Sequence, residues 1–400
     1  MIVNRDILMM MISFIVVSVI LLSCISIGIS FNTKSRVATS TQSTPSTTKL
    51  HANGETSKEP VPSVGGGAKN VNSKLIAGAG AVAAGYFGKQ IMDGPVFTEN
   101  VSLIGKNIVI TGANTGLGKE TAIKLASLGA NLLLLCKTKD RGDAAVADIK
   151  SKTGSSVVSN IVCDLGDLKS VQTAAVEVQK RVKNIDVLLN NAGIMALPQR
   201  TQTKDGFEAH IGINHLGHFA LTQHLLPLVA ASSAGRIISV SSQAHRFGKD
   251  FRDDFMIEKP GAYDPWGAYG NSKLANILFI NSLSEKLKSN PKYSNVFCAS
   301  LHPGLCRTEL GRYFFDVPKD MSPLVGVLAA PLIYFSKSAE QGAQTQIYLA
   351  ATSKISMRDS GKFYDNSAVA DRSSLADDAD LAKWLWHESE TRTGTNPNIV

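Results

Sequence analysis

The sequence predicts an α/β fold, in which helices cover both faces of a doubly wound parallel sheet of about seven strands. Short apolar runs rich in β-branched residues recur from about residue 106 onward and alternate with helical patterns. The first run, Asn107–Thr111, leads directly into a glycine-rich turn and a helix. The chain has 400 residues, 44% of them hydrophobic and 18% charged, so it can form one domain of about 250 to 300 residues with an appended segment.

Charge and cysteine usage argue against several function classes. The formal net charge is +8, but residues 1–94 contain eight basic and four acidic side chains and so hold half of the excess. No basic helix remains to form the electrostatic footprint of a nucleic-acid-binding protein, and we expect no nucleic acid partner.

The five cysteines form no CxxC pair, so we expect buried free thiols rather than disulfides or metal ligands.

Residues 1–30 form a candidate targeting segment. Residues 7–29 are apolar or small almost throughout, and about 23 such residues are enough to span a bilayer. Gly28 and Ser30 provide a small-x-small cleavage site before Phe31. We therefore expect a cleaved signal peptide, with a permanent membrane anchor as the alternative.

Residues 31–94 have a different composition from the rest of the chain. Residues 31–74 contain 14 Ser or Thr, six Lys or Arg and two acidic residues, which is typical of a plastid transit peptide. With the preceding apolar run they resemble the two-part leader of algae whose plastids came from engulfed algae, so we expect a plastid location. The alternative is a disordered linker behind an uncleaved anchor in the endoplasmic reticulum membrane. The apolar stretch Leu75–Gly88, about 14 residues long, is short for a span and is interpreted as a packing helix or interfacial segment.

Residues 95–400 are predicted to form a catalytic domain that begins with a dinucleotide-binding turn. After the first strand, the sequence GANTGLG opens a helix. Its glycines let the backbone approach a pyrophosphate, and the N–H groups of the first helical turn face the negative charge. The TGxxxGxG spacing resembles the fingerprint of the short-chain dehydrogenase/reductase family, which has a Rossmann-type fold. The resemblance implies that the cofactor contacts Gly112, Asn114, Thr115, Gly116, Leu117 and Gly118.

The ends of the second and third strands bear on the choice of dinucleotide. Lys137 follows the strand Asn131–Leu135, where an acidic side chain would select NAD through the ribose 2′-hydroxyl. An ammonium there, with Lys139 close by, would pair with a 2′-phosphate, so NADP(H) is the expected cofactor; the alternative is two solvated loop lysines. The resemblance implies that Asp164, followed by Leu165, hydrogen-bonds the adenine.

Two further motifs appear in the order typical of the family. Asn191, Ala192 and Gly193 follow the strand Asp186–Asn190 and resemble the family's NNAG, where small residues let the chain pass close to the nicotinamide ribose. The later segment NHLGHF resembles the family's NHxGHF. This implies that its Asn214 opens the helix and holds a water that connects the catalytic lysine to solvent.

The helix around Asn214 is rich in histidine, which raises the alternative of a metal site. The spacings of three and four residues place several imidazoles on one helix face. No carboxylate or thiolate set converges with them in the motifs, so we expect no metal. The histidines are His210, His215, His218 and His224.

The predicted chemistry depends on Ser242, Tyr269 and Lys273. Ser242 ends the pair that follows the strand Arg236–Ser241, and Ser241 is the fallback. A spacing of four residues puts Tyr269 and Lys273 on one helix face. In a partly desolvated cleft the ammonium, aided by oxidised nicotinamide and the helix N-terminus, can lower the pKa of the phenol from about 10 to the roughly 7 or 8 that proton transfer near neutrality requires. The resemblance to the family's YxxxK implies hydride transfer between nicotinamide and a carbonyl or carbinol carbon. Tyr269 then exchanges the proton, Ser242 hydrogen-bonds the oxygen, and Lys273 also holds the ribose.

Downstream motifs complete the resemblance. Pro303, Gly304 and Thr308 resemble the family's PG motif and its cofactor-facing threonine. Residues 314–335 are apolar, at a place where family members have a mobile substrate lid. This composition favours an apolar substrate or a membrane-surface contact, with core packing as the alternative.

The motifs most resemble the retinol dehydrogenase-like branch of the family, which includes the WW-domain oxidoreductases and a chloroplast translocon component. They are HxGHF, YxxSKLAN, SxHPGxxxTEL and the later SGKFY. We therefore expect an NADP(H)-dependent oxidoreductase acting on a retinoid-, steroid- or lipid-like carbonyl or alcohol. The alternative is an NADPH-binding redox sensor or scaffold of a plastid-envelope complex with little turnover. Light-dependent protochlorophyllide oxidoreductase is more distant, because its long insertion before the tyrosine is missing. The sequence indicates no particular oligomeric state.

Overall fold

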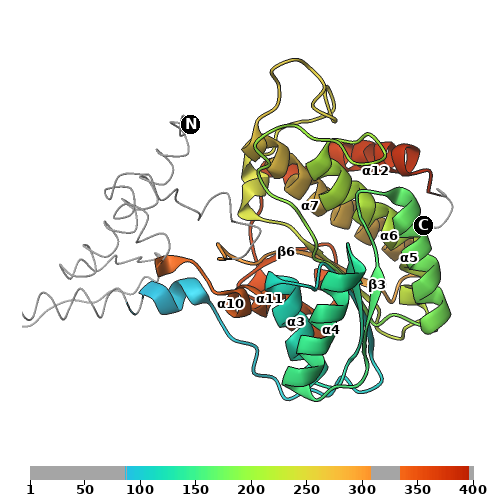
Figure 1. Cartoon of the computed structure of the whole chain (residues 1–400). Helices are drawn as coiled ribbons and strands as arrows, with labels where there is room; N and C mark the ends of the chain where they lie inside the picture. Colours follow the sequence, from blue (N-terminus) through green and yellow to red (C-terminus); the bar gives the residue numbers. More distant parts are fainter. Residues whose placement is uncertain (1–85, 87, 308–333, 396–400) are drawn as a thin grey trace, which may run out of the picture. The chain divides into compact units, whose positions relative to one another are not determined.

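A single eight-stranded sheet forms the centre of the fold (Figure 1). The strand order is β3-β2-β1-β4-β5-β6-β7-β8, and neighbours from β3 to β7 are parallel. This confirms the predicted doubly wound parallel sheet; the short antiparallel β8 is an addition that the sequence analysis missed. The strands are β1 Asn107–Thr111, β2 Asn131–Cys136, β3 Val158–Val162, β4 Val187–Asn190, β5 Arg236–Val240, β6 Phe297–His302, β7 Phe363–Asp365 and β8 Ala368–Val369.

The computed structural model describes residue 86 and residues 88–307 and 334–395. The described residues from Gln90 onward belong to one compact unit. The predicted signal and transit segments, most of the predicted lid and Thr308 lie outside these ranges. Within them, no helix has the length and apolar character needed to cross a membrane.

Helices cover both faces of the sheet (Figure 1). The helices α3, α4 and α11 pack on one face, and α5, α6 and α7 pack on the other. Their bounds are α3 Gly116–Ser127, α4 Lys139–Thr153, α5 Leu168–Arg181, α6 Gly217–Ala230, α7 Pro265–Ser289, α10 Ala339–Gly342, α11 Gln344–Ala351 and α12 Ala379–Thr393.

The alternation of side chains in β1 explains why both faces are apolar. Ile108 and Ile110 are fully buried among the residues of one helical layer, and Val109 is fully buried among those of the other. Successive side chains of a strand point to opposite faces, so a central parallel strand has to be apolar at every position. The uninterrupted runs in the sequence are the direct result.

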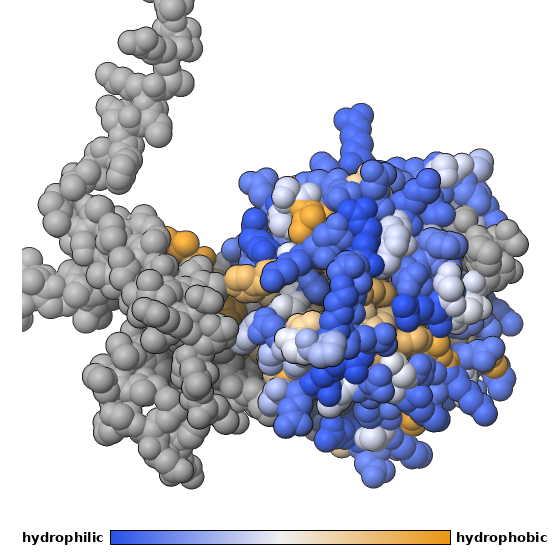
Figure 2. All heavy atoms as spheres, turned by 90° about the horizontal axis from the view of Figure 1, so that it is seen from above, coloured by the Kyte–Doolittle hydropathy of each residue, from blue (hydrophilic) through white to orange (hydrophobic). Residues whose placement is uncertain are grey.

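A third apolar cluster attaches α12 to the outer side of α7. Leu274 and Leu278 of α7 pack with Leu381 and Leu385 of α12, and all four are buried. The helix that holds the YxxxK motif is therefore covered on its outer side as well as against the sheet. On the face of the molecule in Figure 2, hydrophilic side chains predominate and hydrophobic ones form small groups.

The strand order reverses direction at the end of β1. The chain runs from β1 outward to β2 and β3, then returns to the other side of β1 to form β4. In doubly wound sheets, ligands bind at the carboxyl ends of the strands where the order reverses in this way. The glycine turn after β1 and the segment after β4 both lie at this edge.

Candidate active site

The start of α7 sets the position of the YxxxK residues. Asp264 caps the helix by accepting a hydrogen bond from Gly267 N at 2.6 Å, and Pro265 occupies the first turn. Tyr269 and Lys273 follow on the buried side and are 5% and 2% exposed. The Lys273 Nζ atom lies 5.6 Å from the centroid of the Tyr269 ring and donates to Val240 O at 3.0 Å.

Of the two serines after β5, Ser242 is the one that faces the phenol. Its hydroxyl lies close enough to the Tyr269 phenol to lower the pKa of that group, and its Oγ atom accepts from Ala244 N at 3.2 Å. Ser241 points the other way, because its hydroxyl donates to Lys273 O at 2.7 Å. Of the two serines, the structure therefore places Ser242 next to the phenol and turns Ser241 toward the backbone of α7.

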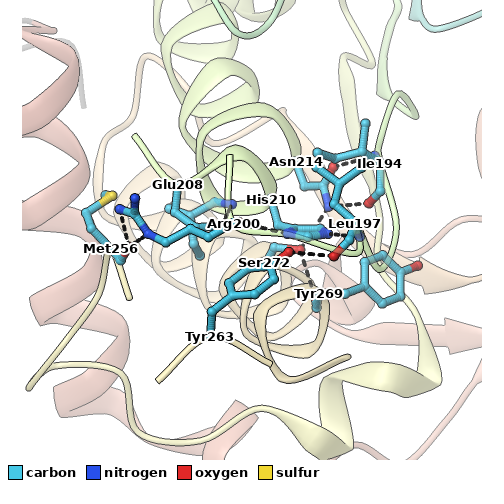
Figure 3. A network of polar contacts seen from close by, with 11 residues as sticks. Ile194, Leu197, Arg200, Glu208, His210, Asn214, Met256, Tyr263, Tyr269 and Ser272 are labelled. Atoms are coloured by element: carbon cyan, nitrogen blue, oxygen red, sulfur yellow. Dashed lines mark hydrogen bonds and ion pairs between the residues drawn. The ribbon is translucent and has the colours of Figure 1, made fainter. Parts of the chain in front are cut away.

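Asn214 lies in a π-helix, Ile211–Leu216, immediately before α6. Its side chain makes a pair of hydrogen bonds with Ile194, accepting from the backbone N at 2.8 Å and donating to the backbone O at 3.0 Å (Figure 3). It also donates to Ser272 Oγ at 2.9 Å. Widened turns of this kind occur frequently at functional sites, and this one turns the Asn214 amide toward the segment after β4.

Gly193 marks the point where these side chains meet. A Cβ atom on Gly193 would lie 3.1 Å from Asn214 Oδ1 and 3.5 Å from Lys273 Nζ. The last residue of NNAG thus touches both the amide and the ammonium. The structure brings Asn214, Tyr269, Lys273 and Ser242 together beside the segment predicted to hold the nicotinamide.

Burial changes the pKa values of the two central groups in a direction that the sequence analysis did not predict. Desolvation raises the pKa of Tyr269 to about 12, although the hydrogen bond from Ser242 lowers it. Desolvation also lowers the pKa of Lys273 to about 8. The protein's own groups therefore do not produce the expected depression of the tyrosine pKa, because spacing shows which charges are neighbours but not how deeply they are buried.

The glycine turn fits closely against NNAG. Gly112 has a φ of +65°, and a Cβ atom there would lie 2.9 Å from Ala192 Cα. A Cβ atom on Gly118 would lie 2.5 Å from Asn191 Nδ2. The helix α3 begins after Thr115, whose side chain makes no capping hydrogen bond, and its first turn contains no acidic residue. This helix N-terminus therefore suits an anionic group.

Thr111, at the end of β1, connects the segment after β4 to α6 in a way that the sequence analysis missed. Its Oγ atom accepts from Asn191 N at 2.9 Å and from Ala192 N at 3.0 Å. His218 Nδ1 lies 3.0 Å from Asn214 O, which can only accept, so Nδ1 carries the proton. The Thr111 hydroxyl therefore donates to His218 Nε2 at 2.8 Å. Burial lowers the pKa of His218 to about 4, which keeps the imidazole neutral and this pattern intact.

The two residues predicted to bind the adenosine half pair with each other. Lys137 Nζ lies 3.1 Å from Asp164 Oδ2, and the lysine side chain is 65% exposed. Asp164 also accepts from Gly166 N at 3.0 Å, which fixes the turn that contains Leu165. Lys139 does not join this pair, because its ammonium pairs with Asp143 on α4.

The PG motif after β6 also lies near the phenol. Gly304 has a φ of +92°, and a Cβ atom there would lie 2.7 Å from Lys337 Cδ. Cys306 donates from Sγ to Pro303 O at 3.4 Å and is close enough to Tyr269 to contribute to its raised pKa. Lys337 and Cys306 were not among the predicted site residues. No local motif marks them, since only the tertiary fold brings residue 337 to Gly304.

The histidines do not form a metal site among the residues that the structure describes, where no three His, Cys, Asp or Glu side chains are grouped as ligands. His215 hydrogen-bonds Ser389 Oγ at 2.8 Å, and His218 hydrogen-bonds Thr111. His210 pairs with Glu208 at 2.8 Å. Each of these imidazoles therefore has a structural partner other than a metal.

The fold and the site define the class of protein. The family model of the short chain dehydrogenases matches residues 106–317, which include the glycine turn, NNAG and the serine, tyrosine and lysine described above. The chain therefore belongs to the short chain dehydrogenase family of oxidoreductases. Within this family it belongs to the retinol dehydrogenase-like branch.

The relatives that support this placement match most of the folded chain. Mouse retinol dehydrogenase 13 is 38% identical over 309 residues, which cover 76% of this chain and 89% of the relative. Human retinol dehydrogenase 11 is 39% identical over 301 residues, which cover 75% of this chain and 90% of the relative. A solved structure from Mycobacterium paratuberculosis has a TM-score of 0.59 at 33% identity and covers 76% of this chain and 99% of its own. A short chain dehydrogenase from Shigella flexneri, complexed with NADP, shares the fold, with a TM-score of 0.52 at 24% identity over 68% of this chain and all of its own.

Proposed function

We propose that this protein is an NADP(H)-dependent oxidoreductase that interconverts a carbonyl and an alcohol by hydride transfer. The observation that supports it most directly is the convergence of Asn214, Ser242, Tyr269 and Lys273 beside Gly193. Nucleophilic or metal-assisted hydrolysis does not need a buried phenol–lysine pair next to a glycine turn. Proton exchange coupled to hydride transfer uses both parts of the site.

The residues at the carboxyl edge of the sheet fit a dinucleotide. The amide groups at the start of α3 would hold the pyrophosphate, and Asn191, Ala192 and Gly193 would border the nicotinamide ribose, whose hydroxyls Lys273 would bind. Lys137 would pair with the 2′-phosphate and Asp164 would meet the adenine, so the ion pair between them would exchange for contacts with the nucleotide. When bound, the nicotinamide supplies or accepts the hydride.

The protein's own residues would move the proton. In the reducing direction the phenol of Tyr269 donates its proton to the carbonyl oxygen, while Ser242 donates a hydrogen bond to the same oxygen. The raised pKa keeps Tyr269 protonated before the reaction, and the positive charge at Lys273 would lower it as the proton is transferred. The phenolate left behind would be stabilised by a positive charge at Lys273. Asn214 would hold a water that connects the lysine to solvent, through which a proton is returned.

An apolar substrate fits the surroundings of these groups. Phe247 and Leu305 are large apolar side chains that remain 42% and 41% exposed, in the segments that follow Ser242 and Gly304. The relatives of the retinol dehydrogenase-like branch also support a retinoid-like substrate. We expect NADPH-dependent reduction of at least one carbonyl in a panel of retinoid, steroid, quinone and lipid substrates. Tight NADPH binding without any turnover would instead support the sensor or scaffold function.

Changing Lys137 to aspartate is expected to invert the preference for NADP(H). The ammonium contact with a 2′-phosphate contributes roughly 1.5 to 3 kcal/mol, and a carboxylate there would repel the phosphate but accept from a 2′-hydroxyl. Dissociation constants for NADPH and NADH, measured by fluorescence titration, test this. Lys139→Asp is the matched control and should leave the preference unchanged, since Lys139 pairs with Asp143. Equal affinity of the unaltered protein for NADPH and NADH would contradict the proposal.

The N-terminal segments are proposed to direct the protein to a plastid. Residues 1–74 fused to a fluorescent protein should reach the plastid of an alga with a secondary plastid, because the apolar run enters the secretory route and the basic Ser/Thr-rich part is then exposed. Removal of residues 7–30 should leave the fusion in the cytosol. Retention of the whole leader on the mature protein, seen by N-terminal sequencing, would favour an anchor in the endoplasmic reticulum membrane.

A further inference from the structure

A buried carboxylate and imidazole, Glu208 and His210, lie beside the catalytic tyrosine (Figure 3). Both side chains are fully buried, and their separation between Glu208 Oε1 and His210 Nδ1 is 2.8 Å. Glu208 Oε2 accepts a second hydrogen bond from Ile211 N at 2.9 Å. The proposed mechanism uses neither residue, and a carboxylate is costly to bury unless it is paired and hydrogen-bonded, as Glu208 is.

The hydrogen bonds determine where the proton of the imidazole lies. Leu197 N approaches His210 Nε2 at 3.3 Å, and a backbone N–H can only donate. Nε2 is therefore the acceptor, and Nδ1 carries the proton that is donated to Glu208. The carboxylate thus holds His210 as the neutral Nδ1–H tautomer, the form that can accept from Leu197.

The segment that His210 holds runs along the active site. At its start, Ile194 is held by two of the three hydrogen bonds of the Asn214 amide. At its end, Leu197 donates to His210 and its carbonyl accepts from Tyr263 Oη at 2.8 Å. Between them Ala196 has a φ of +47°, a conformation that a residue with a side chain keeps only when its neighbours hold it.

The same imidazole also contacts the catalytic phenol. The His210 and Tyr269 rings pack edge to face with centroids 6.3 Å apart, and the Tyr263 ring stacks on His210 at 6.5 Å. One side chain therefore touches both the ring that would exchange the proton and the backbone of the neighbouring segment. A rotation of His210 would move both.

We propose that Glu208 and His210 are positioning residues for the reaction. Glu208 fixes the tautomer and orientation of His210, and His210 aligns the Tyr269 ring with the segment 194–197, against which the carbonyl substrate would lie. This inference rests on the proposed oxidoreductase function. It predicts an effect on turnover and not on dinucleotide affinity, since neither residue belongs to the glycine turn or the adenosine half of the site.

Glu208→Gln is the sharpest test because it preserves size. An amide has only one acceptor oxygen, so the NH₂ group of the new side chain would face a second donor, either Ile211 N–H or His210 Nδ1–H. The imidazole could avoid this clash by changing tautomer, but its Nε2–H would then face the Leu197 N–H. We expect kcat to fall about 10- to 100-fold, as small misplacements of reacting groups do, with the NADPH dissociation constant unchanged. Glu177→Gln, which removes an exposed carboxylate paired with Arg181 on α5, is the matched control and should keep full activity.

Two measurements that need no substrate separate this inference from the proposed function. Side-chain ¹⁵N NMR should show the Nδ1–H tautomer for His210, assigned by loss of its signal in His210→Asn, and Glu208→Gln should change that tautomer. Hydrogen exchange at the Leu197 amide should become faster in Glu208→Gln. If the unaltered protein turns over no carbonyl, the proposed function fails, and these two signals alone decide whether the pair holds Leu197.

Tyr263→Phe provides an independent check, because it releases the Leu197 carbonyl without touching Glu208. It should lower kcat in the same direction, and the double variant should lose less than the product of the two effects, since both act on one segment. Unchanged kcat in Glu208→Gln, or an Nε2–H tautomer in the unaltered protein, would overturn the inference. So would a parallel fall of NADPH affinity and kcat, which indicates general destabilisation.

Discussion

Replacing Tyr269 with phenylalanine is expected to lower turnover about 100- to 10,000-fold while NADPH still binds. The substitution removes only the hydroxyl that would exchange the proton, and positioned acid–base catalysis contributes a factor of that size. The ring stays in its buried place between His210 and Trp266, which both pack edge to face against it. Steady-state rates with one substrate of the panel and a fluorescence titration with NADPH measure the two effects separately.

The control for this experiment is Tyr348→Phe. Tyr348 lies on α11, against the opposite face of the sheet from α7, and its loss of a hydroxyl should leave kcat unchanged. A Tyr269→Phe variant that kept the unaltered rate would contradict the proposed role of the phenol. A variant that lost NADPH affinity as well would show that the hydroxyl holds the dinucleotide.

Replacing Lys273 with methionine is expected to have the larger effect on catalysis, about 10,000-fold or more. The variant loses the charge that stabilises the phenolate and also a donor for the ribose hydroxyls, so NADPH should bind about tenfold more weakly, or about 1.4 kcal/mol. Methionine has a similar length and leaves the Val240 carbonyl with its second donor, Asn276 Nδ2, at 3.2 Å. Wild-type turnover in this variant would rule out the proposed mechanism.

The same variant should be more stable than the unaltered protein when no dinucleotide is added. Burial lowers the pKa of Lys273 from 10.5 to about 8, so below pH 8 the folded state bears the full cost of the buried ammonium, about 3 kcal/mol. Between pH 8 and 10.5 the unfolded state binds the proton and the folded state does not, so stability rises with pH. Urea unfolding should show that Lys273 contributes a rise of about 2 kcal/mol from pH 7 to about pH 9.5. This contribution should be absent in Lys273→Met; an identical pH dependence in both proteins would contradict it.

The parallel core of the fold could be predicted because its strands are buried on both faces. The run Asn107–Thr111 was predicted with the bounds that β1 has. The predicted strands Asn131–Leu135, Asp186–Asn190 and Arg236–Ser241 each differ from β2, β4 and β5 by one residue at one end. The last two strands of the sheet, β7 and β8, have three and two residues and no such run. Their pairing depends on the residues around β6, which the local sequence does not reveal.

For the candidate site too, features set by local spacing could be predicted from the sequence, and features set by the tertiary fold could not. Spacing along the chain could place Tyr269 and Lys273 on one helix face, and motif order could place Gly193 near them. The raised pKa of Tyr269 depends on burial by the whole fold. The bond between Thr111 and His218 joins residues 107 apart in the chain, so no window of sequence contains it.

Thr111 also limits which segments of this domain can be exchanged with those of a relative to make a chimera. A chimera that takes the strands up to β3 from one protein and the catalytic helices from another cuts the chain between Thr111 and His218. A valine at position 111 would have a similar shape but would leave the partly buried Ala192 N–H and the buried His218 Nε2 atom without a partner, at a cost of roughly 1 to 3 kcal/mol for each such group. The Asn191 N–H would keep its hydrogen bond to Leu189 O at 3.1 Å. The nucleotide-binding half and the catalytic half of the chain are therefore interchangeable among relatives only where the threonine and the histidine are inherited together.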